Sequence, residues 1–424
     1  MIRTHTIPCR LPRVLADALN AASAALYTGV LIWHWRTYRR KGHWLSEAAA
    51  CRWSDARGKA PLHAHSIDAA QQGFYQACAT TRALHQAGLP AARFPYHRRK
   101  FRTTIWKNTG IRRKGDVLIL SQGRGNPPIT LALPESLHNV LRCLEVRLVY
   151  DQRARRYTWH IVVENGANPK PAPGDHVVSV DLGEIHPAVV GDEHEASIIT
   201  CRQRRAESQG HARRMAQINR ALSRKQKGSK RYRRLMQAKA RMKAKHQRVL
   251  HDLEHKISRA VVETAVKQAA GTIVIGDVRD VADGVACGSR QNQRMSQWNH
   301  GKVRQYIEYK AEAEGIAVQL EEEAYTSQTC PQCQHRHKPK GRRYRCPACG
   351  LQAHRDVVGQ VNILSVFQHG EPGKIPPPAV VKYRIPHNLR VMRSCRDTGQ
   401  DTGTRKQPGK PVARTTHVRE AAGL

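Results

Sequence analysis

The sequence predicts an α+β protein of several domains, with an N-terminal β-barrel interrupted by a helical insert and a C-terminal α/β domain. Three observations lead to this prediction. At 424 residues the chain is long enough to bury roughly two to four cores. Its first half changes from long Ala-rich helical runs to short apolar strands separated by turn signals. Its second half alternates strands with helices and contains two C-x-x-C motifs, which indicate an inserted metal-binding ribbon.

The charge of the chain indicates a polyanionic partner. Lys and Arg number 72 against 33 Asp and Glu, which gives a formal net charge of +39. A folded protein with this much self-repulsion normally works beside a polyanion, so a merely soluble basic enzyme fits least. Nucleic acid fits better than a membrane surface, because the basic residues run through the whole chain. Aromatic residues make up only 5% of the chain, so contacts to the nucleic-acid backbone should dominate over base stacking.

The sequence also predicts a cytoplasmic protein that does not enter a membrane. Residues 1–13 have no apolar core of the kind that a secretory signal requires. The longest apolar stretch, residues 21–33, is about half of a membrane span, and we interpret it as a core helix. Most cysteines outside the two C-x-x-C motifs are scattered, which suits a reducing compartment better than a disulfide framework.

The N-terminal half is divided by its local patterns. Residues 1–12 alternate polar and apolar side chains, as a short strand does. Residues 13–112 predict a helical domain punctuated by Gly and Pro. Residues 113–170 predict several strands with turns between them, so that they and residues 1–12 would form one β-barrel around the helical insert. A linker rich in Pro and Gly follows at residues 165–175.

Two segments of the C-terminal half are strongly basic. Residues 202–262 predict a helical hairpin, and between 202 and 248 there are 18 Lys and Arg but a single acid, Glu207. This density of one sign favours a surface that faces a polyanion over a merely solvated one. Residues 367–424 lose their apolar periodicity and predict a disordered basic tail.

Four cysteines are spaced as the ligands of a structural metal site. Two C-x-x-C knuckles, separated by twelve residues, can bring four thiolates into a tetrahedron around zinc. An iron–sulfur cluster is the alternative, but it would favour more apolar surroundings than the basic loop between these knuckles. Because all four positions are filled, the site should stabilise structure and not catalyse. The four residues are Cys330, Cys333, Cys346 and Cys349, in a ribbon that covers residues 330–349.

Two acids far apart in the sequence are candidates for a second metal site. Asp181 follows the apolar strand VVSV, and Asp356 lies in a helix-like segment just after the ribbon. An RNase H-like fold gathers carboxylates from distant segments in this way, and such groups can hold two divalent ions about 3.5–4 Å apart. Oxygen ligands with open water positions favour Mg²⁺ or Mn²⁺. Asp181 alone could equally be a strand-ending cap, and the order of the parts is what favours a metal site.

With these motifs the chain resembles the TnpB proteins of bacterial insertion elements, relatives of the compact type V CRISPR effectors. The matching stretches are VSVDLG, the hairpin end RVLHDLEHKIS, QWNHGKVRQYIEYKAEAEG, AYTSQTCPQC and HRDVVGQVNIL. The last two together are specific to this superfamily, whereas VDLG alone is a weak signal. The resemblance covers residues 177–363 strongly and the N-terminal half by layout only.

The resemblance implies a fold, an activity and partners. It implies that Asp181 and Asp356 are the first and third carboxylates of a RuvC-like nuclease domain, residues 171–329 and 350–366. It implies Mg²⁺ or Mn²⁺ at these acids, zinc at the four cysteines, and cleavage of target double-stranded DNA directed by a guide RNA. The N-terminal barrel, called the wedge, and the helical recognition domain would grip the guide and the target duplex. A short motif flanking the target would be read by the protein.

One departure from the family pattern concerns the second carboxylate. The family usually has Glu where this sequence has Gly276, followed by Asp277. The next predicted strand brings three acids, residues 321–323, and neighbouring strands lie about 4.8 Å apart. A Glu at the end of that strand could reach over Gly276 to the same metal, and resemblance to some family members favours Glu323. Glu321 and Asp277 are the alternatives, as is an inactive nuclease.

Two other functions are open at this point. An RNA-guided binder with a silent nuclease would act by occupying DNA, and a structural RNA-binding protein would not use the acids at all. Mg²⁺-dependent cleavage of a guide-matched duplex separates the nuclease from both, and guided DNA binding separates these two from each other.

Overall fold

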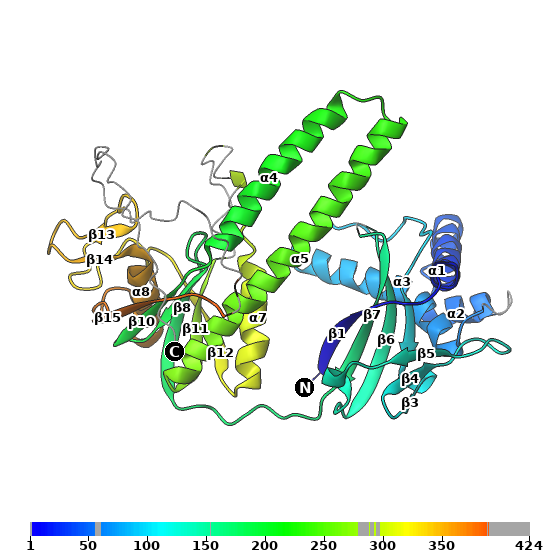
Figure 1. Cartoon of the computed structure of the whole chain (residues 1–424), viewed down its shortest axis with the longest axis horizontal. Helices are drawn as coiled ribbons and strands as arrows, with labels where there is room; N and C mark the ends of the chain where they lie inside the picture. Colours follow the sequence, from blue (N-terminus) through cyan, green and yellow to red (C-terminus); the bar gives the residue numbers. More distant parts are fainter. Residues whose placement is uncertain are drawn as a thin grey trace, which may run out of the picture. The chain divides into compact units, whose positions relative to one another are not determined.

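The computed structural model describes residues 2–55, 61–152, 154–278 and 297–387, with isolated residues at 288, 292, 293 and 389. Within these residues the strands form sheets of six, four, three and two strands. Figure 1 shows the six-stranded sheet in the C-terminal half of the chain and the four- and three-stranded sheets in the N-terminal half. The chain is therefore a mixed α/β protein, as predicted.

The N-terminal strands enclose a core that two sheets share. They are β1 (Ile2–Pro8), β2 (Thr104–Lys107), β3 (Ile111–Lys114), β4 (Val117–Leu120), β5 (Ile129–Ala132), β6 (Arg142–Asp151) and β7 (Arg156–Glu164). The four-stranded sheet has the antiparallel order β1-β7-β6-β2, and the three-stranded sheet has the order β3-β4-β5. Alternating apolar side chains of both sheets pack into one cluster around Trp106 and Trp159.

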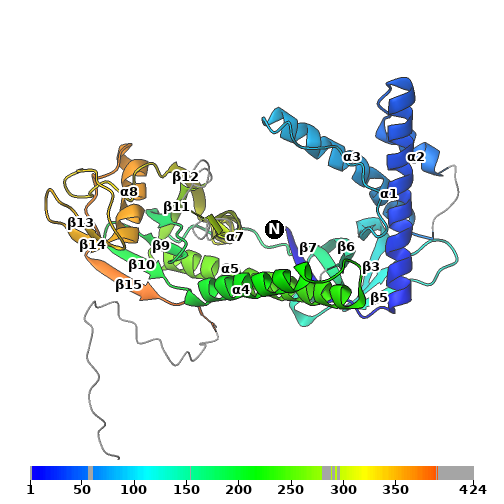
Figure 2. The same ribbon diagram turned by 90° about the horizontal axis from the view of Figure 1, so that it is seen from above.

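Three helices lie between β1 and β2 in the sequence: α1 (Arg13–Lys41), α2 (Glu47–Asp55) and α3 (Ala64–Gln86). α1 ends at Gly42, whose φ of 62° allows its N–H to donate to the Tyr38 carbonyl. α1 packs against α3 (Figure 2). The rings of Tyr27 and Phe74 meet edge to face in the buried cluster between the two helices. By length and composition α1 could also cross a membrane, although 44% of its apolar window is buried inside the protein.

The six-stranded sheet of the C-terminal half positions the candidate site. Its strands are β8 (His176–Asp181), β9 (Ala188–Gly191), β10 (Glu195–Ile199), β11 (Ala270–Asp277), β12 (Ala317–Glu322) and β15 (Val380–Arg384). In the order β12-β11-β8-β9-β10-β15, the first three strands run parallel and β9 is antiparallel to both of its neighbours. Since β8, β11 and β12 are parallel, their carboxyl ends lie side by side at one end of the sheet.

Helices cover the apolar strands of this sheet. The helices described in this half of the chain are α4 (Arg202–Ser223), α5 (Lys230–Lys267), α7 (His300–Ala313) and α8 (Arg355–His369). α8 packs against β8, β9, β11 and β12, whereas α5 packs against β9, β10 and β11. Ile257 of α5 and Val361 of α8 are fully buried. The middle strands are accordingly apolar almost throughout, as parallel strands buried on both faces are.

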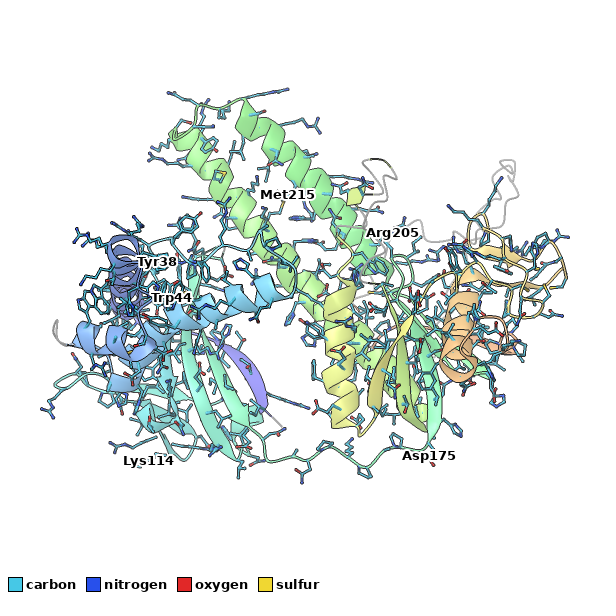
Figure 3. All side chains as sticks on the ribbon, turned by 180° about the vertical axis from the view of Figure 1, so that it is seen from behind. Tyr38, Trp44, Lys114, Asp175, Arg205 and Met215 are labelled. Carbon is cyan, nitrogen blue, oxygen red and sulfur yellow. The ribbon has the colours of Figure 1, made fainter. Side chains whose placement is uncertain are left out.

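The basic hairpin predicted at residues 202–262 consists of α4 and α5, and α5 continues to Lys267. Ser229 caps α5, because its side chain accepts a hydrogen bond from a backbone N–H of the first turn. Figure 3 shows side chains standing out along both helices, with Arg205 near the start of α4 and Met215 further along. The hairpin thus presents a long, mostly basic surface.

The predicted disordered tail needs correction. α8 continues to His369, and β15 pairs in parallel with β10 as the sixth strand of the sheet, so residues 367–387 belong to the folded domain. The physical reason is that Val and Tyr at positions 380–383 favour an extended chain, and β10 offers an open edge for pairing. Most of the remaining tail, residues 390–424, lies outside the described residues.

Two further expectations differ from the structure. The first strand of the barrel segment begins at Thr104, within the predicted helical domain of residues 13–112, because the helices end earlier, at Gln86. The N-terminal strands pair as two separate sheets, so the hydrogen-bonded order does not form one continuous barrel. Strands β9 and β10, which complete the large sheet, are not predicted from the sequence.

Candidate active site

Two of the predicted acids lie where a strand ends and a helix begins. Asp181 is the last residue of β8, and Asp356 is the second residue of α8. His354 caps α8, since its Nδ1 accepts a hydrogen bond from the Asp356 N–H at 3.3 Å. α8 approaches β8 so closely that a Cβ atom on Gly359 would lie 2.6 Å from Asp181 Oδ2. Gly359, which the sequence patterns did not single out, therefore lets the helix that carries Asp356 pack against Asp181.

The third predicted acid lies over a glycine of the neighbouring strand. β11 and β12 are parallel, with Gly276 opposite Glu321 and Asp277 opposite Glu322. Glu323 follows β12 directly, and a Cβ atom on Gly276 would lie 1.9 Å from Glu323 Oε1. The Glu323 carboxylate therefore occupies the space that a side chain at position 276 would fill. This is the placement that the sequence predicts for it.

All three acids line one pocket of about 880 Å³ at this end of the sheet. Asp277, Glu321 and Glu322 line it as well, and Arg355 is the one basic residue among its described lining residues. Asp277, the last residue of β11, thus borders the pocket although Glu323 is the acid that lies over Gly276. Six carboxylates therefore surround one hollow in a strongly basic protein.

Burial and mutual repulsion raise the pKa of two of these acids. The pKa of Asp181 lies well above its usual value, mainly because of burial and further because of the negative charges of Glu323 and Asp356. Burial raises the pKa of Glu323 to about 7, with a contribution from the charge of Asp277. Acids that interact this strongly share their protons, so the cluster titrates as a unit.

The cluster fits a divalent cation. Its donors are carboxylate oxygens, the ligands that Mg²⁺ and Mn²⁺ prefer. Within the described part of the chain, Glu323 Oε1 is buried without a hydrogen-bond partner. A buried carboxylate oxygen without a partner is costly when it is charged, and a bound cation would remove this cost. Glu323 is therefore the acid of this strand pair that best fits a cation ligand.

Asp356 has positive and imidazole neighbours that sequence reasoning missed. Arg342 Nη1 lies 3.9 Å and His354 Nδ1 lies 4.0 Å from Asp356 Oδ2. His186, His354 and Asp356 each offer a ligand atom, and these atoms lie within 4.8 Å of one another. No spacing rule connects these positions in the sequence, because a loop, the ribbon and α8 bring them together only in the fold.

Two aromatic residues, Trp298 and Tyr325, also border the pocket. Trp298 is half-buried, and Tyr309 on α7 is 37% exposed.

The four cysteines meet in the ribbon as predicted. The Sγ atoms of Cys330 and Cys349 are 3.6 Å apart, and those of Cys333 and Cys346 are 3.5 Å apart. A tetrahedron with Zn–S distances of about 2.3 Å would place its sulfurs roughly 3.8 Å apart, whereas a disulfide needs about 2.05 Å. All four ligand atoms lie within 4.8 Å of one another, so the cluster could hold zinc.

The fold of the chain is similar to that of a solved structure. The solved structure of a complex of Cas12f1, single-guide RNA and target DNA matches it with a TM-score of 0.59 and 13% sequence identity, and the match covers 83% of each chain. At this identity the likeness concerns the fold alone.

Sequence comparisons find similar proteins over parts of the chain. The family model described as "Probable transposase" matches residues 160–282, and the one described as "Cas12f1-like, TNB domain" matches residues 300–363. A TnpB-like protein of Methanocaldococcus jannaschii is 32% identical over 126 residues, which cover 29% of this chain and 45% of that protein. The CRISPR-associated endodeoxyribonuclease Cas12f1 of Sulfoacidibacillus thermotolerans is 36% identical over 114 residues, which cover 26% of this chain and 25% of that one. Over these stretches the chain is similar to TnpB-like and Cas12f1 proteins, and it matches less than half the length of either relative.

Proposed function

We propose that this protein is an RNA-guided DNA endonuclease that cuts guide-matched double-stranded DNA beside a short flanking motif. The observation that carries the proposal is the pocket in which Asp181, Glu323 and Asp356 meet, in a protein with a net charge of +39. A Cas12f1 relative is an endodeoxyribonuclease, and a chain of the same fold is known in complex with single-guide RNA and target DNA. In this proposal the six-stranded sheet is the core of an RNase H-like, RuvC-like domain, the two N-terminal sheets form the wedge domain, and the protein works in the cytoplasm.

The three acids would hold Mg²⁺ or Mn²⁺, and such ions, when bound, activate water and stabilise the leaving 3′ oxygen. The residues of the chain supply position and environment. The ends of β8 and β12 and the start of α8 fix the carboxylates on rigid elements, and Gly359 keeps α8 close to Asp181. Guide pairing would read the target sequence, while the protein binds the backbone of the heteroduplex. The ribbon would hold zinc on its four cysteines and stabilise the domain.

The metal affinity of the site is predicted to rise with pH. Because the pKa of Glu323 is about 7 and that of Asp181 is raised, the metal-free cluster holds protons at pH 6 that a cation must displace. We expect the affinity for Mn²⁺ to increase up to about tenfold per pH unit for each proton released, and the contribution of Glu323 to level off about one pH unit above its pKa. Calorimetric titration in two buffers of different ionisation enthalpy measures the protons released. Glu323→Gln should reduce the slope of Mn²⁺ affinity against pH. An affinity that stays constant from pH 5.5 to 7.5 in the wild type would contradict the raised pKa values.

Guide binding is predicted to depend on the basic hairpin. Arg231, Arg233 and Arg234 are exposed near its turn, and each phosphate that a cation neutralises releases counterions. Replacing these three residues with Glu should weaken RNA binding. It should also make the plot of log K against log salt concentration less steep, by the equivalent of up to about three phosphate contacts. Reversing the three exposed Lys and Arg at the end of α1, Arg39, Arg40 and Lys41, provides a comparison of equal charge in the helical domain, which would grip the guide as well. An unchanged slope and affinity would show that the hairpin turn faces solvent.

The test of the function uses the full chain with whatever RNA it carries. The protein is expressed with its flanking DNA, co-purified RNA is sequenced, and a duplex that matches the 3′ variable part of that RNA is offered in Mg²⁺. Cleavage of the matched duplex, absent from a scrambled one and from Asp181→Ala, is the expected result. Guided binding without cleavage in Mg²⁺ or Mn²⁺ would instead identify a nuclease-silent DNA-binding protein.

A further inference from the structure

Tyr325 combines three properties that residues rarely share. It lies two positions after Glu323 and borders the carboxylate pocket. Its φ is +63°, in the left-handed region that bulky side chains seldom adopt. It is also 50% exposed, so burial of its ring does not offset the unfavourable backbone. Glycine or Asn would suit this backbone better, so the presence of a large aromatic ring needs another explanation.

Hydrogen bonds fix the backbone on both sides of this residue. The Tyr325 carbonyl accepts from the N–H groups of Gln328 and Thr329 at 2.9 and 3.0 Å. Just before it the Glu323 carbonyl accepts from the Thr326 N–H at 3.2 Å. The buried Asn362 of α8 donates to the carbonyls of Thr326 and Thr329 at 2.7 and 2.8 Å. The turn is thus tied to the helix that carries Asp356, and the backbone of Tyr325 is held at the edge of the pocket.

One neighbour of the ring is a cation. The guanidinium of Arg336 lies over the Tyr325 ring, and the backbone of Arg336 pairs with Thr329 as an isolated antiparallel bridge. Arg336 therefore supports the ring from the ribbon side without burying it. A guanidinium beside an aromatic ring also suits a ligand that has both a flat face and a phosphate.

The charge of the pocket explains why a stacking surface is useful there. Six carboxylates and, among the described lining residues, one Arg surround the space in which a phosphate would have to lie. Bound cations offset part of the repulsion between these acids and a nucleic-acid strand, but an aromatic face attracts a base whatever the charges are. Trp298, on the segment before α7, borders the same pocket and offers a second aromatic surface.

We propose that Tyr325 is a base-stacking residue that seats an unpaired nucleobase of the strand to be cut, next to the phosphate at the carboxylates. The ligand class is single-stranded nucleic acid, bound with little preference for the identity of the base. The inference rests on the proposed function for the statement that the strand is cut. The stacking itself does not depend on cleavage.

The test removes the ring and keeps the turn. Tyr325→Asn suits a left-handed backbone, Tyr325→Phe keeps the ring, and Tyr309→Ala removes an exposed tyrosine that does not border this pocket. Zinc content and melting temperature verify that each variant folds. The substrate is a strand with 2-aminopurine or an abasic site at successive positions around the mapped cut, offered to the protein with its co-purified RNA.

Stacking on one ring corresponds to roughly 5- to 150-fold in binding. We therefore expect an abasic site beside the cut to raise KM by a factor in this range for the wild type and for Tyr325→Phe. The same abasic site should add nothing in Tyr325→Asn, whose KM is already raised while its kcat changes less. Equal effects of the abasic site in wild type and Tyr325→Asn would overturn the proposal, as would an unchanged KM in Tyr325→Asn.

A second measurement keeps this inference separate from the nuclease activity. With Ca²⁺ in place of Mg²⁺, 2-aminopurine in a short single strand should be quenched by the wild type and by Tyr309→Ala but not by Tyr325→Asn. If the wild type cuts nothing yet shows this pattern, the proposed function fails and the stacking stands. If the wild type cuts but quenching is the same in Tyr325→Asn, the stacking proposal fails and the function stands.

Discussion

Replacing Glu323 with Ala is expected to abolish Mg²⁺-dependent cleavage as completely as replacing Asp181, while guided DNA binding is retained. The reason is the geometry at the end of β12, where the Glu323 carboxylate lies over Gly276 in the pocket that Asp181 and Asp356 also line. Two carboxylates alone would hold a pair of divalent ions weakly. Loss of a ligand should lower the cleavage rate by roughly a hundredfold or more, measured by single-turnover assays on a guide-matched duplex.

The glycine provides a sharper form of the same experiment. In Gly276→Glu the added side chain would collide with Glu323, since even a Cβ atom there would lie 1.9 Å from Glu323 Oε1. In the double variant Gly276→Glu, Glu323→Ala that space is free, and a carboxylate from β11 can enter the pocket in place of the one from β12. We expect the double variant to recover part of the cleavage that Glu323→Ala loses. Recovery by exchange would show that the position of the carboxylate matters, and not merely the integrity of the turn.

The neighbouring acids are the matched controls. Glu322 is exposed and borders the same pocket, and Glu322→Ala should cut at close to the wild-type rate. Asp277→Ala should retain substantial activity. The raised pKa of Asp181 shows the charges of Glu323 and Asp356 acting on it, whereas the charge of Asp277 acts on the pKa of Glu323. Asp277 is therefore the outer member of the cluster. Suppose instead that Asp277→Ala abolishes cleavage and Glu323→Ala is tolerated. The second metal-binding carboxylate would then be Asp277, next to Gly276 on β11, and not Glu323 after β12.

The parts of the site that the sequence could predict are those set by local pattern. An apolar run ending in Asp181, and paired C-x-x-C motifs, are readable because strand ends and knuckles bring their own ligands to one place. The Glu323 placement needed only one non-local assumption, that β11 and β12 are neighbours, and the register places Gly276 opposite Glu321.

The parts that could not be predicted depend on distant contacts or on the backbone. β9 has only four residues, and β15 joins the sheet more than 180 residues after its partner β10 along the chain, so no local period marks the pairing. Gly359 matters only because α8 crosses Asp181, and the left-handed φ of Tyr325 is imposed by hydrogen bonds from elsewhere in the fold. Contacts and backbone angles distinguish Gly359 and Tyr325, whereas motif spacing does not.

Loss of the ribbon metal is expected to have the second large effect, on stability and on cleavage together. Purified protein should contain one equivalent of zinc by elemental analysis, and the double variant Cys346→Ser, Cys349→Ser should contain none. Metal binding in such sites is folding energy, about 10–16 kcal/mol in isolated zinc-finger peptides. The ribbon should therefore unfold without metal, and the melting temperature should fall in the variant and in wild type treated with a chelator.

The consequence should reach the carboxylates because the ribbon packs on the helix that carries one of them. Cys330, Cys346 and Tyr344 form a buried cluster with Val358, which lies two residues after Asp356 on α8. Cys330 also follows the turn that carries Glu323 to the pocket, so an unfolded ribbon would free that turn. Cleavage should fall with the zinc content, while Cys9→Ser and Cys51→Ser, which change cysteines outside the ribbon, should alter neither. Absence of zinc from freshly purified, reduced protein would contradict the assignment of a zinc site. Iron in place of zinc would favour an iron–sulfur cluster. Loss of zinc without any loss of cleavage would show that the turn holds Glu323 without help from the ribbon.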